Sequence, residues 1–120
     1  MPRERRRGPV AMSADELASF LEQRPTGAIC VTDSAVRLVA LPAAVLGQED
    51  DTLKVEIDGL DEPLVPGTAV CVVADRFPSY EAIRGIITQG SITSTEHVRP
   101  PSVAVAVTRT VTFSFANVIT

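Results

Sequence analysis

Residues 68–92 read TAVCVVADRFPSYEAIRGIITQGSI, two apolar runs separated by a polar break. The first run, residues 69–74, and the second, residues 83–92, are rich in valine and isoleucine, whose branched side chains favour the pleated surface of a strand. Pro78, in the break, has no N–H to donate to a neighbouring strand, so it belongs in a link. Both runs are too short for an amphipathic helix. The stretch therefore predicts the central antiparallel strand pair of a small β-barrel.

Further elements are expected on both sides of this pair. Apolar runs predict strands at residues 27–32 and 37–41, and residues that alternate between two faces predict strands at 52–57 and 103–115. Ser13 and Glu16 form the Ser-x-x-Glu pattern of a capping box ahead of an apolar run, which predicts a helix at residues 14–23. Six strands with short turns, and one or two short helices, indicate a mainly β protein, a six-stranded antiparallel split β-barrel.

The length and the charge limit the classes of protein to which the chain can belong. Its 120 residues suffice for one domain, which we expect at residues 13–120, after a disordered basic tail at residues 1–12. Four arginines and one glutamate give the first seven residues a charge of +3, which leaves −7 on the rest of a chain whose net charge is −4. An acidic domain argues against nucleic-acid binding, because phosphate contacts require a basic surface.

Neither a membrane segment nor a secretory leader is apparent in the sequence. No apolar run approaches the ~20 residues that cross a bilayer. The basic start is followed by Gly8-Pro9 and then by acidic residues, instead of the apolar segment of a leader. We therefore expect no membrane partner and a cytoplasmic location.

The motifs of the common enzyme classes are absent. The chain has no phosphate-binding loop of the Gly-x-x-x-x-Gly-Lys type, no Gly-x-Gly-x-x-Gly and no Gly-x-Ser-x-Gly. Cys30 and Cys71 fall in apolar, strand-like runs, and His97, the single histidine, is predicted to be an exposed loop residue. Because a zinc site needs about four ligands, we expect both cysteines in the core and no metal site. The sequence identifies no catalytic residue.

The order of the elements resembles that of the pyridoxamine 5'-phosphate oxidase-like FMN-binding split barrels. The segments that carry the resemblance are TGAICVTD at 26–33, RLVALP at 37–42, TLKVEI at 52–57, GTAVCVVADRFPSYEAIRGIITQGSI at 67–92 and VTRTVTFSF at 107–115. Together they cover most of residues 13–116. The resemblance implies a homodimer that holds a flavin-type cofactor, FMN, between its subunits.

Three residues are candidates for cofactor binding. Arg37 opens the second strand, where the family commonly has a basic residue near the flavin phosphate, and a guanidinium binds phosphate oxygens through two charge-assisted hydrogen bonds. Tyr80 is the only tyrosine, and its ring is suited either to stack on a planar cofactor or to hold the link in place. Arg84 is suited to bind an anionic ligand or to pair with a nearby carboxylate.

One segment departs from the family pattern. After the third strand the family usually has Ser or Thr followed by Arg and Lys, which bind the phosphate, whereas residues 56–62 of this chain read EIDGLDE. Two hypotheses remain. The first is an FMN-dependent oxidoreductase, with a deazaflavin or heme as alternative cofactors. The second is a cofactor-free dimeric split barrel with a binding or structural role.

Overall fold

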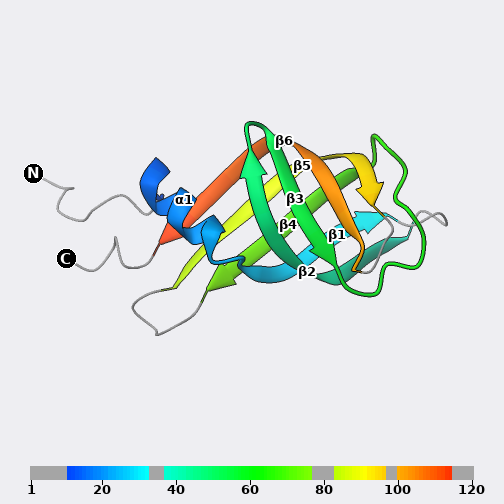
Figure 1. Ribbon diagram of the computed structural model, residues 1–120, viewed down its shortest axis with the longest axis horizontal. Helices are drawn as coiled ribbons and strands as arrows, with labels where there is room; N and C mark the ends of the chain where they lie inside the picture. Colours follow the sequence, from blue (N-terminus) through cyan, green and yellow to red (C-terminus); the bar gives the residue numbers. More distant parts are fainter. Residues whose placement is uncertain (1–10, 33–36, 77–82, 97–99, 115–120) are drawn as a thin grey trace, which may run out of the picture.

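The computed structural model describes residues 11–32, 37–76, 83–96 and 100–114, which form one helix and six strands (Figure 1). In chain order the elements are α1 (Ala14–Glu22), β1 (Thr26–Thr32), β2 (Leu38–Glu49), β3 (Thr52–Ile57), β4 (Ala69–Arg76), β5 (Arg84–Glu96) and β6 (Ser102–Ser114).

The six strands close into a barrel in the order β1-β2-β3-β6-β5-β4, and every neighbouring pair is antiparallel. The predicted central pair is β4 and β5, which are joined from Ala69 opposite Ser91 to Arg76 opposite Arg84. β1, β2 and β3 follow one another as a meander, and β6 closes the barrel between β3 and β5. The mainly β fold with a six-stranded antiparallel barrel is therefore confirmed.

Aliphatic side chains fill the interior of the barrel. Along β4, Val70, Val72 and Ala74 are buried, while Cys71 is half-buried and Val73 is exposed. The other strands contribute inner residues in the same alternating way, because successive side chains of a strand point to opposite faces. This alternation decides which side chains share the outer wall, where the candidate site lies.

Helix α1 lies at one end of the barrel (Figure 1). The Ser13 hydroxyl accepts a hydrogen bond from the Glu16 N–H at 3.2 Å, and the Glu16 carboxylate accepts one from the Ser13 N–H at 3.2 Å. These two bonds confirm the predicted capping box. The apolar side of the helix, with Phe20 and Leu21, is buried in the core.

The first described residues attach the start of the domain to β6. Met12, which the sequence places at the end of the tail, is buried in the core, and its N–H donates to the Thr112 hydroxyl at 2.9 Å. Residues 1–10 of the predicted tail lie outside the described residues.

β2 continues through Pro42 and is longer than the predicted strand at residues 37–41. Proline is tolerated here because the regular pairing of β2 with β3 ends at Ala43 opposite Ile57, so the missing N–H interrupts no ladder bond. The Pro42 carbonyl oxygen still accepts a hydrogen bond from the Asp58 N–H at 2.9 Å.

The prediction that both cysteines lie in the core is wrong. Cys30 and Cys71 are free, half-buried thiols that face each other from β1 and β4 on the outer wall. Burial, followed by the proximity of Cys30, raises the pKa of the Cys71 thiol. The sequence hides this placement because residues 69–74 are apolar on both faces of the strand. None of the described segments contains a helix long and apolar enough to span a membrane.

Candidate functional site

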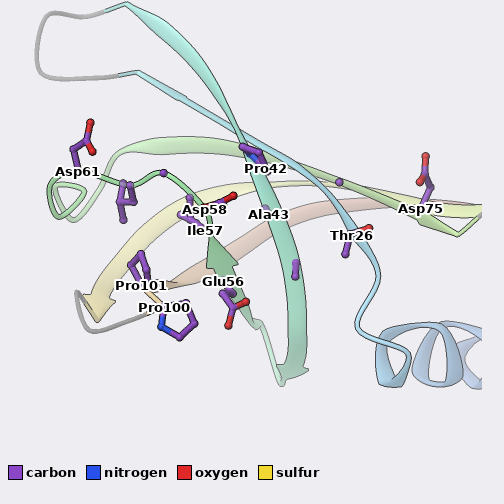
Figure 2. Close-up of a pocket in the computed structure, with 14 residues that line it drawn as sticks. Thr26, Pro42, Ala43, Glu56, Ile57, Asp58, Asp61, Asp75, Pro100 and Pro101 are labelled. Atoms are coloured by element: carbon purple, nitrogen blue, oxygen red, sulfur yellow. The ribbon is translucent and has the colours of Figure 1, made fainter.

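A cleft with a volume of about 1210 Å³ lies on the barrel wall, where β1, β2 and β3 meet the segment that follows β3 (Figure 2). We call it the wall cleft. Its lining residues are Thr26, Gly27, Pro42, Ala43, Ala44, Glu56, Ile57, Asp58, Gly59, Leu60, Asp61, Asp75, Pro100 and Pro101.

Strand register brings one row of these residues together from four strands. Thr26 of β1 lies opposite Ala44 of β2 on one side and Asp75 of β4 on the other. Ala44 in turn lies opposite Glu56 of β3. The two central residues of the row, Ala44 and Thr26, have small side chains, and a carboxylate stands at each end of the row. The row therefore forms a hollow with acidic borders.

The segment after β3 forms the raised side of the cleft. The Ile57 N–H donates to the Pro101 carbonyl oxygen at 2.9 Å, and the Asp58 N–H donates to Pro42 at 2.9 Å, so the chain stays beside β2 and the start of β6. Gly59 then turns the chain with a φ of 82°, a conformation that glycine adopts without strain. In Figure 2 Asp58 and Asp61 lie on this side of the cleft.

The lining combines apolar surface with negative charge. Two alanines, three prolines, Ile57 and Leu60 supply apolar atoms, and proline and alanine present smooth faces to a ring system. The charged residues of the lining are Glu56, Asp58, Asp61 and Asp75, and the lining contains no arginine, lysine or histidine. The cleft therefore repels anions and attracts cations.

The carboxylates are too dispersed to bind a metal ion. Within the described ranges, no group of three or more His, Cys, Asp or Glu side chains is arranged to hold one.

The structure places two of the three predicted cofactor residues, Arg37 and Arg84, at different points. Arg37 is exposed and directly precedes β2, and Arg84 is half-buried at the start of β5. Neither of the two lines the wall cleft. Tyr80 lies outside the described residues, as does His97.

Sequence reasoning singled out the acidic segment 56–62 but missed the small residues on the other side of the cleft. Thr26 and Ala44 are separated by 18 positions, and only the pairing of β1 with β2 makes them neighbours. A weak signal was available, because Thr26-Gly27 and Ala43-Ala44 are pairs of small residues in otherwise bulky strands. One residue of each pair, Thr26 and Ala44, lies on the outer face, where its small side chain leaves space on the wall of the sheet.

The two parts of FMN, the flavin ring and the phosphate, differ in how well they match the lining of the wall cleft. The flavin ring suits the apolar faces of Pro42, Ala44 and Leu60. The phosphate does not fit, because a dianion bound among four carboxylates with no basic lining residue is repelled from every side. The lining therefore has apolar surface suited to a ring system, and its charge disfavours a phosphate.

No family model, curated protein or solved structure matches the chain.

Proposed function

We propose that the protein is a homodimeric split barrel of the pyridoxamine 5'-phosphate oxidase-like type that binds a flat small molecule in the wall cleft. The observation that carries the proposal is the wall cleft itself, a hollow of about 1210 Å³ that four strands and the segment after β3 surround. Its volume slightly exceeds the ~300–1,000 Å³ of most small-molecule sites.

The charge of the lining selects the class of ligand. Glu56 is half-buried, so its carboxylate is less screened by water than those of the exposed Asp58, Asp61 and Asp75. A neutral or cationic ring gains from these four groups, whereas an anionic one loses. The proposed ligand is therefore a flat heterocycle without a phosphate or carboxylate group.

An apolar strip on the barrel wall supports the homodimer. Ala28, Val73, Ile87 and Val111 are consecutive register partners across β1, β4, β5 and β6. Val73, Ile87 and Val111 remain 37%, 38% and 42% exposed. Ala28 also lies opposite Pro42 of the wall cleft, so a second copy on the apolar strip would border the ligand.

Riboflavin and FMN form a matched pair of probes, because they share one ring system and differ only in the phosphate. We expect riboflavin to bind at least about tenfold more tightly than FMN, which corresponds to roughly 1.4 kcal/mol of repulsion. The quenching of flavin fluorescence on titration with protein measures both affinities. Equal affinities, or tighter binding of FMN, would contradict the proposed charge selection.

The homodimer is tested by placing a charge in the apolar strip. Ile87→Asp is expected to convert the dimer into a monomer, because an interface core does not accept an unpaired carboxylate. Sedimentation equilibrium measures the mass of each variant. Gln89→Asp is the matched control, because Gln89 is exposed on the same strand two residues away. A wild-type protein that is monomeric at high concentration would exclude the homodimer.

An FMN-dependent oxidoreductase is the second candidate, favoured by the resemblance and by the closed barrel of six antiparallel strands. In such enzymes the flavin ring supplies the redox chemistry and the protein supplies orientation. The purified protein would then be yellow, and Arg37→Ala would lower its FMN affinity about tenfold. Colourless protein that binds no added FMN, deazaflavin or heme would exclude this candidate.

A further inference from the structure

Three polar residues form a row across β4, β5 and β6. Arg76 lies opposite Arg84, and Arg84 lies opposite Ser114. We call these three residues the arginine row. It is at the end of the barrel where α1 lies, because β4 and β6 end there and β5 begins there (Figure 1).

The arginine row continues the inner face of the barrel. Ala74 and Ile86 are register partners one step further into the barrel, and each is only 1% exposed. Side chains two positions apart on a strand share a face. Arg76 and Arg84 therefore point to the same side as these core residues, and away from the wall cleft.

Two buried polar atoms of the row have no hydrogen-bond partner. They are Nε of Arg84 and the hydroxyl oxygen of Ser114. Ser114 is completely buried. Buried polar groups in folded proteins are almost always hydrogen-bonded, so two such atoms on register partners are suited to bind the same hydrogen-bonding group.

The neighbouring hydroxyls show that the row is exceptional. Thr88 and Thr110 bond each other through their hydroxyl oxygens at 3.2 Å, and the Thr112 hydroxyl accepts from the Met12 N–H at 2.9 Å. The threonines on the inner side of β5 and β6 thus have partners within the protein. Ser114, the next inner residue of β6, does not.

The charges of the row also require a partner. Two guanidinium groups opposite each other on neighbouring strands repel. No carboxylate of the described residues forms an ion pair with either Arg76 or Arg84. An anion between them would remove the repulsion and would accept hydrogen bonds from Arg84 Nε and from Ser114.

We propose that Arg76, Arg84 and Ser114 bind a phosphate-type oxyanion at the α1 end of the barrel. The guanidinium groups donate N–H bonds to two or more oxygens in the planar geometry that suits phosphate, and the Ser114 hydroxyl donates to another. The site is separate from the wall cleft, because Asp75 faces the cleft while the adjacent Arg76 points to the opposite side of the sheet. It does not depend on the function proposed for the cleft.

Isothermal titration calorimetry with inorganic phosphate, at constant ionic strength in chloride, tests the site. We expect one phosphate per chain in the wild type and at least about tenfold weaker binding in Arg84→Met, which keeps the apolar stem and removes the charge. Arg109→Met is the matched control, because Arg109 is exposed and lies opposite Gln89 on the outer wall. The affinity of this control for phosphate should equal that of the wild type.

Stability supplies a second measurement that does not require affinity data. Phosphate should raise the unfolding temperature of the wild type and leave that of Arg84→Met unchanged, because only a folded state with the site gains from the ligand. If Arg84→Met does not fold, Arg76→Met, at an exposed position, replaces it. Absence of phosphate binding by the wild type, or an unchanged affinity in both variants, overturns the proposal.

Discussion

The wall cleft and the arginine row have opposite charges although they are separated by a single step of the chain. Asp75 lies in the cleft, whose lining has four carboxylates and no basic side chain. Arg76, the next residue of β4, belongs to a row with two guanidinium groups and no carboxylate. The alternation of side chains along a strand sorts the two charges onto opposite faces.

This difference shows how one strand can carry side chains of opposite charge for two proposed sites. The backbone of β4 supports both sites, while the side chains of the two sites lie on opposite faces of the sheet. A change of charge in one site should therefore leave the other unaffected, whereas a change in the backbone they share should disturb both.

The largest loss of stability and binding is expected for a substitution that displaces the backbone shared by both sites. A Cβ on Gly27 would overlap the backbone carbonyl oxygen of Val73, so Gly27→Ala must push β1 away from β4. We expect a loss of about 3 kcal/mol in the free energy of unfolding, as for other forced overpacking, and weaker binding at both sites. Urea denaturation measures the loss. Thr26→Ala, at the adjacent exposed position, is the control and should change stability by less than ~0.5 kcal/mol.

A charge reversal confined to the cleft should have an intermediate effect. Asp58→Lys is expected to increase FMN affinity about tenfold or more, because it removes one repulsive carboxylate and adds a phosphate partner. Binding of inorganic phosphate at the arginine row should not change. Asp51→Lys makes the same charge change at an exposed turn outside the cleft, and an equal gain in that control would show that only net charge matters.

The smallest change in stability is expected when an exposed charge that already has an ion-pair partner is removed. The Lys54 ammonium donates to the Glu96 carboxylate at 2.9 Å, and this hydrogen bond, with the charge of Lys54, lowers the pKa of Glu96. Lys54→Met should raise that pKa toward its ordinary value, as carboxyl chemical shifts during a pH titration would show. A glutamate whose pKa is lowered in the folded state stabilises that state at pH values above the ordinary glutamate pKa. This contribution is lost as the pH falls through the lowered pKa, so any difference in stability between the wild type and Lys54→Met should vanish in acid.

Both side chains of this pair are more than half exposed, so the stability of Lys54→Met at neutral pH should match that of the wild type closely. Lys54→Arg keeps the charge and should leave the pKa of Glu96 low. A Glu96 pKa that does not respond to Lys54→Met would contradict the assigned cause.

The barrel could be predicted from the sequence because its signals are local. Branched apolar runs mark the strands, Ser13 and Glu16 mark the start of α1, and Pro78 separates the central pair. The wall cleft could not be predicted, because Thr26, Ala44 and Asp75 become neighbours only through register. The inner or outer position of Cys71 was equally hidden, since both faces of its strand are apolar.

The arginine row shows the same limit. The sequence marked Arg84 as suited to an anionic ligand or to a nearby carboxylate, but its register partners Arg76 and Ser114 are 8 and 30 positions away and carry no motif. Long-range pairing determines what surrounds a side chain, and no local pattern in the sequence encodes it.

Closure of the barrel has a consequence for how new specificity could arise in this protein. Each of the six described strands pairs with a neighbour on both sides, so no strand offers its whole edge to an incoming peptide strand. Recognition must then occur through side chains on the wall or at the ends. Such side chains can be exchanged one at a time while the hydrogen-bonded frame stays intact, which makes the scaffold easy to redirect toward another ligand.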